Sequence, residues 1–260
     1  MVRPVEAFDS NTRYPDAVQI VDSPNHDRRP SQGTIDTLVL HYTGMKDFES
    51  ALARLTDPVA RVSAHYLIDE VGEVFQLVSE ERRAWHAGVA SWCGTEDING
   101  CSIGIELVNP GHEFGYRPFP QAQIAALHLL AKDVLVRQRI PSHRVLGHSD
   151  IAPTRRCDPG ELFDWEGAAA AGIGVWPVAF DLPSQSKDAS LELGCEGEDV
   201  REVQQSLARF GYGIEPTGVF DEMMRDVVTA FQRHFRQARV DGILDFETQG
   251  RLAVLLEHCG

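Results

Sequence analysis

The chain contains the apolar run Thr37-Leu-Val-Leu-His41, which is typical of a short strand covered on both faces. A second run of this kind is Cys101-Ser-Ile-Gly-Ile-Glu-Leu-Val108. Between the two, segments 62–69 and 72–78 flank a Glu-Val-Gly turn and predict a β-hairpin. Together these segments predict a mixed sheet.

Amphipathic segments lie between and after the predicted strands. Residues 121–138 carry apolar side chains at the i, i+3 spacing of a helix that packs one face on a core. A second helix is expected over 47–55. Strands that alternate with helices predict an α/β domain with a mixed central sheet flanked by helices over residues 1–177. Within it, residues 1–33 lack periodicity and are interpreted as an irregular N-terminal arm.

The last part of the chain has a different pattern. Residues 178–188 are rich in Pro and Ser and predict a linker. Residues 189–260 predict a small domain of three helices, over 199–210, 221–235 and 248–258. The sequences Gly218-Val-Phe-Asp221 and Gly242-Ile-Leu-Asp245 repeat a turn that opens a helix, with Asp221 placed as an N-cap.

Composition excludes several classes of partner. The 260 residues include 24 basic and 39 acidic side chains, and the net charge of −15 repels nucleic acid and anionic lipid. No stretch approaches the ~18 apolar residues that span a bilayer. The N-terminus lacks an apolar signal-peptide core, so a cytoplasmic location is expected, or a periplasmic one if the native start differs. Five cysteines favour reduced thiols, with a Cys93–Cys101 bridge as the alternative.

Two of the ten histidines, His41 and His148, directly follow short apolar strands. Residues at strand ends in α/β sheets face the usual ligand crevice. Asp158 follows His148 by ten residues, and two imidazoles with one carboxylate form a common catalytic zinc set. The other histidines without an evident companion are interpreted as structural: His26, His112, His128, His143, His234 and His258.

Glu106 stands alone as a carboxylate in an otherwise apolar strand. Burying a carboxylate there costs free energy unless it is paired or faces a cavity. One interpretation is a salt bridge to an arginine such as Arg156. The other is a general base whose proton affinity burial has raised.

Five stretches, in order across residues 34–177, resemble the zinc-dependent N-acetylmuramoyl-L-alanine amidases of the type 2 amidase family, in the AmpD and AmiD branch. They are Val39-Leu-His-Tyr-Thr43, Val62-Ser-Ala-His-Tyr-Leu-Ile-Asp69, Arg83-Ala-Trp-His-Ala-Gly88, Ser102-Ile-Gly-Ile-Glu-Leu107 and Gly147-His-Ser-Asp-Ile-Ala-Pro153. The resemblance implies a central mixed sheet with helices, as in peptidoglycan recognition proteins.

The resemblance also implies residue roles. His41, His148 and Asp158 would bind Zn²⁺, with Glu106 as the acid/base residue. The residues expected at the substrate groove are Tyr42, His65, Trp85 and His86. The open alternative for His65 is a structural role, as a strand histidine held by a structural hydrogen bond.

The chain departs from the family pattern two residues before the aspartate ligand. Arg156 stands where the family usually has lysine, and both cations can stabilise a developing oxyanion. The guanidinium is larger and flatter, so its placement need not match. Related phage and recognition-protein enzymes use a cysteine as the third ligand, which raises Cys157 as a candidate. The context Asp158-Pro-Gly160 favours Asp158 and predicts that Cys157 points away.

The tail resembles the peptidoglycan-binding domain PG_binding_1, through Val200-x-x-Val-Gln-Gln-x-Leu207, Gly218-x-Phe-Asp221 and Asp241-Gly242 among others. The alternative is a helical packing or dimerisation module. The expected function is hydrolysis of the bond between N-acetylmuramic acid and L-alanine in peptidoglycan or muropeptides, with the tail as a tether. Two alternatives are a recognition protein without catalysis and a zinc peptidase that cuts within the stem peptide.

Overall fold

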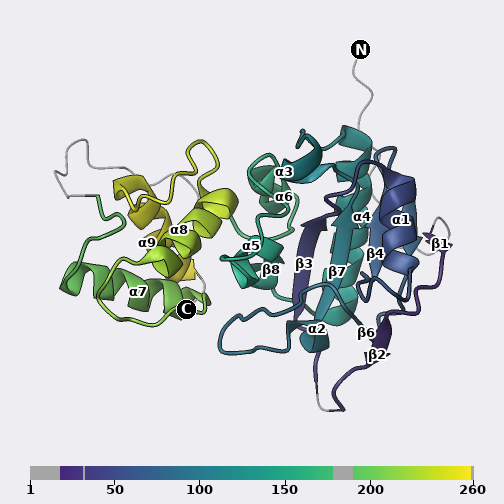
Figure 1. Cartoon of the computed structure of the whole chain (residues 1–260), viewed down its shortest axis with the longest axis horizontal. Helices are drawn as coiled ribbons and strands as arrows, with labels where there is room; N and C mark the ends of the chain where they lie inside the picture. The colour runs from purple at the N-terminus through teal and green to yellow at the C-terminus, as the bar shows by residue number, and fades with distance from the viewer. Residues whose placement is uncertain (1–17, 32, 178–189, 259–260) are drawn as a thin grey trace.

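The computed structural model describes residues 18–31, 33–177 and 190–258, and Figure 1 shows two lobes side by side. The strands are β1 (Val18–Ile20), β2 (His26–Arg28), β3 (Thr37–Tyr42), β4 (Tyr66–Ile68), β5 (Val74–Gln76), β6 (Arg82–Ala84), β7 (Ser102–Leu107) and β8 (Val145–Gly147). The helices are α1 (Phe48–Thr56), α2 (Ile98–Cys101), α3 (Gly111–Phe114), α4 (Gln121–Gln138), a 3-10 turn (Ser142–Arg144), α5 (His148–Ile151), α6 (Trp165–Ala170), α7 (Glu198–Phe210), α8 (Glu222–Phe235) and α9 (Phe246–His258). The mixed sheet with flanking helices is confirmed.

The larger lobe is built on a six-stranded sheet in the order β1-β5-β4-β7-β3-β8. The two apolar runs became the central strands β3 and β7, which pair in parallel. The predicted hairpin is the antiparallel pair β4 and β5. Parallel pairing of β3 with β8 brings the ends of these two strands to the same edge of the sheet.

The interpretation of residues 1–33 as an irregular arm is wrong for two segments. β1 pairs in parallel with β5 and extends the main sheet, while β2 pairs antiparallel with β6 in a separate ribbon. Each strand is only three residues long and its pattern is partly exposed, so no alternation of apolar residues marks it in the sequence.

Side chains alternate between the two faces of the sheet. Leu38 and Leu40 of β3 pack with Ile103 and Ile105 of β7 in a core completed by α4. On the opposite face, Phe48 and Leu55 of α1 pack on Leu67 and Phe75 in a smaller cluster. This second face is the one to which His41 and Glu106 point, because they alternate with the core residues of β3 and β7.

The smaller lobe consists of α7, α8 and α9. Its two turns repeat the same cap: the Met224 N–H donates to Asp221 Oδ1, and the Thr248 N–H donates to Asp245 Oδ1, both at 2.9 Å. The glycine that precedes each cap, Gly218 or Gly242, has a positive φ. The three predicted helices and the Asp221 cap are confirmed, while the predicted linker lies outside the described residues.

The two lobes share one hydrophobic core. A single buried cluster includes Val39, Leu146 and Ile151 of the larger lobe together with Val227 and Phe231 of α8. In Figure 1, β8 and α5 lie at the junction between the sheet and the C-terminal helices. The smaller lobe is therefore packed against the larger one.

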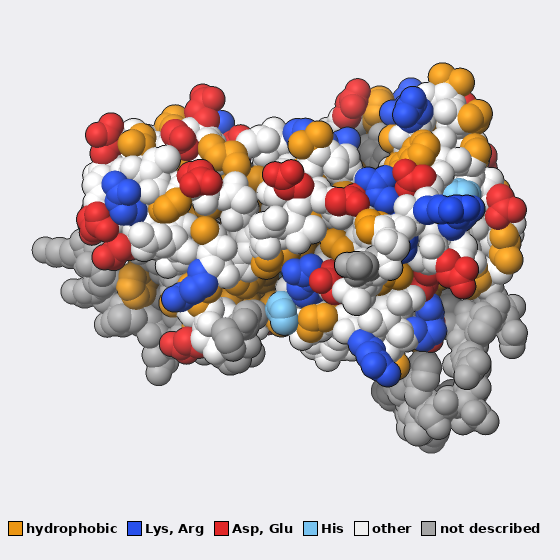
Figure 2. All heavy atoms as spheres, turned by 90° about the horizontal axis from the view of Figure 1, so that it is seen from below, with side chains coloured by type: hydrophobic (Ala, Val, Ile, Leu, Met, Phe, Trp, Pro, Cys, Tyr) orange, Lys and Arg blue, Asp and Glu red, His pale blue; other side chains and the backbone are white. Residues whose placement is uncertain are grey.

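The distribution of charged side chains and the state of the cysteines agree with what the composition indicated. Acidic and basic side chains are interspersed over both lobes on the face drawn in Figure 2. Cys93 and Cys101 are both free, so the alternative of a bridge between them is not realised. Among the described residues, no helix combines the length and the apolar character needed to cross a membrane.

Candidate metal centre and active-site cavity

His41 and Glu106 lie side by side on one face of the sheet. They are register partners in the parallel pair β3 and β7, so their side chains project in the same direction. Gly104, two residues before Glu106, leaves room on that face, because a Cβ at this position would overlap the ring of His86. The two central strands thus supply a candidate ligand, a carboxylate and the space behind them.

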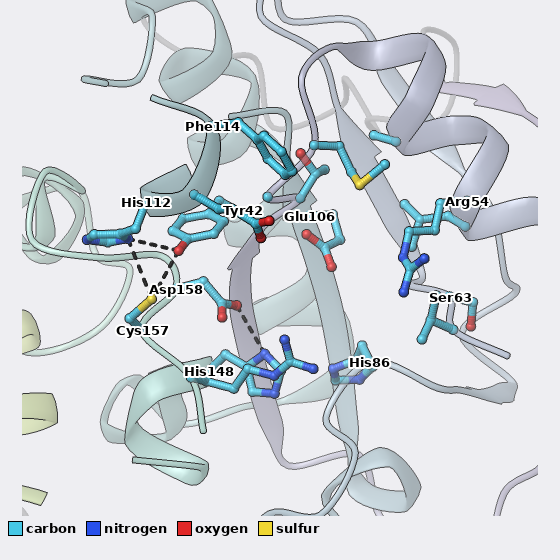
Figure 3. A pocket seen from close by; sticks show the side chains of 18 of the residues that line it. Tyr42, Arg54, Ser63, His86, Glu106, His112, Phe114, His148, Cys157 and Asp158 are labelled. Carbon is cyan, nitrogen blue, oxygen red and sulfur yellow. Dashed lines mark hydrogen bonds and ion pairs between the residues drawn. The ribbon is translucent and has the colours of Figure 1, made fainter. Parts of the chain in front are cut away.

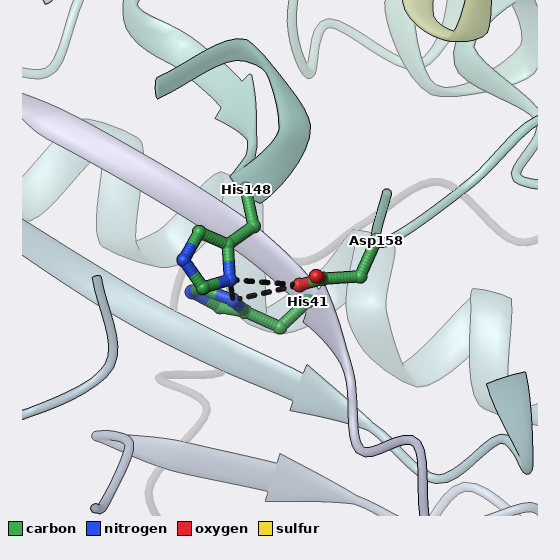
Figure 4. A group of neighbouring side chains, drawn as sticks. All are labelled: His41, His148 and Asp158. Atoms are coloured by element: carbon green, nitrogen blue, oxygen red, sulfur yellow. Dashed lines mark hydrogen bonds and ion pairs between the residues drawn. The ribbon is translucent and has the colours of Figure 1, made fainter. Parts of the chain in front are cut away.

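His148 and Asp158 complete a cluster with His41 (Figure 4). His148 is the first residue of α5, directly after β8. Its Nδ1 atom lies 2.9 Å from His41 Nδ1, and Asp158 Oδ2 lies 3.0 Å from both nitrogens. Two segments that are distant in sequence from His41 therefore meet it at the end of the sheet.

The donor set fits a tetrahedral zinc ion. Bonds of about 2.0–2.1 Å place the ligand atoms of such an ion roughly 3.3 Å apart, close to the separations found here. Burial, with a further contribution from His148, lowers the pKa of His41 to about 4. Burial alone would raise the pKa of Asp158, but His148 and His41 hold it well below its usual range. The neutral imidazole and the ionised carboxylate are the forms that bind metals.

His41 is supported from behind by a chain of hydrogen bonds. Because its Nδ1 faces the cluster, its Nε2–H donates to His86 Nδ1 at 3.0 Å. His86 Nε2–H then donates to Ser102 Oγ at 3.1 Å, and the Ser102 hydroxyl donates to the Ile98 carbonyl at 2.6 Å. This chain fixes the tautomer and the ring orientation of His41.

His148 has its own support. Its Nε2–H donates to the Ala87 carbonyl at 3.0 Å, so Nδ1 is free to act as a ligand. The Ser149 N–H donates to the Asp158 carbonyl at 2.9 Å and ties the two ligand segments together. Both histidines therefore have the outer hydrogen bonds that metal-ligating imidazoles usually have.

A cavity of about 540 Å³ opens beside the cluster. Figure 3 shows Glu106, Tyr42 and Arg54 around it, with His148 and Asp158 at its base. The lining residues are Tyr42, Thr43, Gly44, Met45, Ala51, Arg54, Leu55, Val62, Ser63, Trp85, His86, Glu106, His112, Glu113, Phe114, His148, Arg155, Arg156, Cys157 and Asp158. The size and the mixed lining suit a small polar ligand with an apolar portion.

Glu106 faces the cavity with one oxygen of its carboxylate unpaired. Its Oε2 atom is inaccessible to solvent and has no hydrogen-bond partner. Burial, reinforced by the Asp158 charge, raises the pKa of Glu106 to about 8, while Arg156 acts in the opposite direction. Among the described residues no ion pair joins Glu106 to Arg156, so the salt-bridge interpretation is not supported.

Three of the four residues expected at a substrate groove line the cavity: Tyr42, Trp85 and His86. His65 does not line it. Its Nδ1 accepts from the Gly104 N–H at 3.0 Å, and its Nε2 lies 2.9 Å from Arg29 Nη2 and 3.1 Å from the Arg82 carbonyl oxygen. His65 is fully buried and has the structural role that was the open alternative.

Several residues at the cavity were missed by the sequence analysis. Cys157 lies outside the cluster of His41, His148 and Asp158, as expected, but it lines the cavity. Its Sγ lies 3.1 Å from Tyr42 Oη, which in turn contacts His112 Nδ1 at 2.9 Å. His112 also lies 3.2 Å from Glu161, so its interpretation as a histidine without a companion is wrong. Arg54 comes from α1 on the other side. These side chains come from separate elements, and no sequence spacing links them.

The chain is similar in sequence to proteins of known family. Residues 31–161 match the family described as N-acetylmuramoyl-L-alanine amidase. The chain belongs to this family. Residues 196–252 of the amidase match a family described as a peptidoglycan binding domain.

Relatives with known structures extend the match to both lobes. The amidase is 41% identical over 252 residues to N-acetylmuramoyl-L-alanine amidase AmiD of Escherichia coli, a match that covers 90% of this chain and 87% of that one. A solved complex of AmiD with anhydro-N-acetylmuramic acid-L-Ala-D-γ-Glu-L-Lys superposes with a TM-score of 0.75, at 40% identity over 89% of this chain and 93% of that one. AmpDh3 of Pseudomonas aeruginosa, solved with anhydromuramic pentapeptide, gives 0.71 at 30% identity, over 98% and 99% of the two chains.

Proposed function

We propose that this amidase is a zinc hydrolase whose metal is held by His41, His148 and Asp158. The observation that supports this most directly is the triangle of ligand atoms, with edges of 2.9–3.0 Å, at the base of a cavity. Its position at the ends of β3 and β8 is where α/β sheets bind ligands. A recognition protein without catalysis would not need Glu106, whose buried carboxylate costs free energy.

The chain's own residues supply the proton transfers. Zinc in such a site contributes Lewis acidity, which polarises a carbonyl group and acidifies water. Glu106 would accept the proton of the attacking water and return it to the leaving amine, since its raised pKa suits both directions. Arg156 lines the same cavity and would stabilise the developing oxyanion.

The bond cleaved would be the amide between the lactyl group of N-acetylmuramic or anhydro-muramic acid and L-alanine. Support comes from the family and from the two relatives that were solved with anhydromuramic peptides. Tyr42, Trp85 and His86 would contact the ligand from the walls of the cavity. No such role is proposed for His65.

We also propose a division of labour along the chain: residues 1–177 for catalysis, 178–188 as a linker and 189–260 for wall binding. The two family matches, over 31–161 and 196–252, support it. The cytoplasmic location, or a periplasmic one if the native start differs, stays a prediction.

The test is to incubate zinc-loaded protein separately with anhydro-muropeptide and with intact sacculi and to identify the products by mass spectrometry. Release of intact stem peptide is the expected result. Release from the soluble fragment alone would indicate a recycling amidase, and release from sacculi as well would indicate action on the wall. Fragments of the stem peptide would favour a peptidase, and no release with either substrate would contradict catalysis.

A further inference from the structure

A buried carboxylate, Asp150, joins the metal centre to the C-terminal lobe. Its side chain is completely inaccessible to solvent. It accepts three hydrogen bonds of 2.7 Å each, from the Gly147 N–H, the Tyr212 hydroxyl and the Nδ1–H of His234. Two of the three donors therefore come from the C-terminal lobe. Among the described residues, Tyr212 is the only donor to Asp150 Oδ1, while Gly147 and His234 donate to Oδ2.

Asp150 belongs to the same short helix as His148. It is the third residue of α5, whose first residue is His148. The N–H of Ser149, between the two, donates to the Asp158 carbonyl at 2.9 Å. A shift of this short helix would therefore displace two of the three proposed zinc ligands at once.

The two donors from the C-terminal lobe are held rigidly. The ring of His234 is stacked between Trp165 and Phe235, with centroid distances of 3.6 and 3.8 Å. The ring of Tyr212 packs edge-on against Trp92 at 5.0 Å. Neither side chain can follow Asp150 by rotating, so their positions set the position of the carboxylate.

Loss of either Tyr212 or His234 as a donor would displace Asp150 and, with it, α5. A buried carboxylate that loses a hydrogen bond is left without full compensation for its desolvation. It recovers that compensation by moving toward water, and α5 moves with it. α5 packs against α8 on one side and against β3 and β8 on the other, so such a movement disturbs the metal edge of the sheet.

We propose that the C-terminal lobe is a structural part of the metal centre, in which Tyr212 and His234 act through Asp150 as positioning residues for His148 and Asp158. This inference rests on the proposed zinc site. It goes beyond wall binding, because it gives the C-terminal lobe a role in hydrolysis of substrates too small to reach a wall-binding surface.

The test measures the dissociation constant of zinc for full-length protein by competition with a chelator. Tyr212→Phe and His234→Leu should each weaken zinc binding roughly tenfold, at the lower end of the ~10–100-fold typical of outer hydrogen-bond partners. The visible spectrum of the cobalt-substituted protein should change in both. The kcat for a soluble anhydro-muropeptide should fall, with little change in KM.

Two further variants separate positioning from general packing. The side-chain amide of Asn can donate from about the place of Nδ1, so His234→Asn should keep near wild-type zinc affinity. Gln237→Ala removes hydrogen bonds between the lobes, to the carbonyls of Glu161 and Phe163, without touching Asp150. It should leave both zinc affinity and the cobalt spectrum unchanged.

The outcomes distinguish this inference from the proposed function. A wild-type protein that binds no zinc would contradict the zinc site itself. Wild-type zinc affinity and an unchanged cobalt spectrum in both Tyr212→Phe and His234→Leu would overturn the positioning role alone. Equal losses in Gln237→Ala and His234→Leu would also overturn it, since they would indicate that any loosening of the lobes has the same effect.

Discussion

His41 and His148 approach within 2.9 Å of each other, yet different parts of the molecule hold them in place. His41 is on a central strand, and the hydrogen bonds behind it run through His86 and Ser102 within the larger lobe. His148 is on a four-residue helix whose anchor, Asp150, is bound by side chains of the smaller lobe. One proposed ligand is held by residues of the larger lobe, and the other depends on the packing of the two lobes.

The difference indicates which substitutions should change zinc affinity and how far from the metal centre they can lie. A central strand is fixed by neighbours on both sides, so residues of the smaller lobe should matter little for His41. A short helix has little stability of its own and takes its position from what it packs against. The predictions below test this contrast, from the largest effect to the smallest.

The first prediction concerns the ligands themselves. His41→Ala and His148→Ala should each abolish stoichiometric zinc binding and amide hydrolysis, because two remaining ligands cannot complete a catalytic site. Zinc content of the purified protein and release of stem peptide measure both effects. An active variant that holds no metal would refute the site assignment.

The second prediction separates the metal from the proton carrier. Glu106→Gln should retain zinc and lower kcat/KM by roughly 10²–10⁴-fold, the usual contribution of general acid–base catalysis. The amide has nearly the shape of the carboxylate but cannot accept a proton. A loss of less than about tenfold would count against the role of Glu106.

The third prediction tests the support of His41. His86→Ala should weaken zinc binding by roughly 10–100-fold, because the His41 Nε2–H loses its acceptor. Ser102→Ala, one bond further away, should have a smaller effect. Chelator competition measures both dissociation constants.

The two supports can be compared in one protein. Because His86 and His234 act on different ligands, the free-energy effects of His86→Ala and His234→Leu on zinc binding should add within about 0.5 kcal/mol. A strongly non-additive double variant would show that the supports are one network.

The fourth prediction concerns His65 and the stability of the larger lobe. Burial lowers the pKa of His65 to about 3, from an ordinary value of 6.5. Between these values the unfolded chain binds a proton that the folded chain does not, so this contribution is complete above pH 6.5 and is lost as the pH falls. The free energy of unfolding should drop by up to about 1.4 kcal/mol per pH unit in that window.

Urea denaturation at several pH values between 7 and 4.5 measures this slope. His65→Asn keeps an acceptor for the Gly104 N–H but does not titrate in this range, so it should show a flatter dependence. An equal slope in the two proteins would remove His65 as a cause of acid sensitivity.

Local patterns predicted much of the fold. Apolar runs over 37–41 and 101–108 gave the two central strands, and the periodicity of 121–138 gave α4. The strands β1 and β2 were not predicted. Each has only three partly exposed residues, which form a strand only because β5 or β6 offers an edge to pair with. The helix α5 was missed for a similar reason, since a helix of four residues has no periodicity to read.

The sequence by itself pointed to His41, His148 and Asp158 as zinc ligands and to Glu106 as the acid/base residue, because each stands in a short stretch that resembles a motif of the family. The structure brings the three proposed ligands together, and their roles stay predictions. The sequence could not show that Asp150 is bound by Tyr212 and His234, 62 and 84 residues further on. It also could not show that Cys157 and His112 meet beside Tyr42. Hydrogen bonds between distant segments exist only when packing has brought those segments together, and the packing of the two lobes depends on a core to which both contribute.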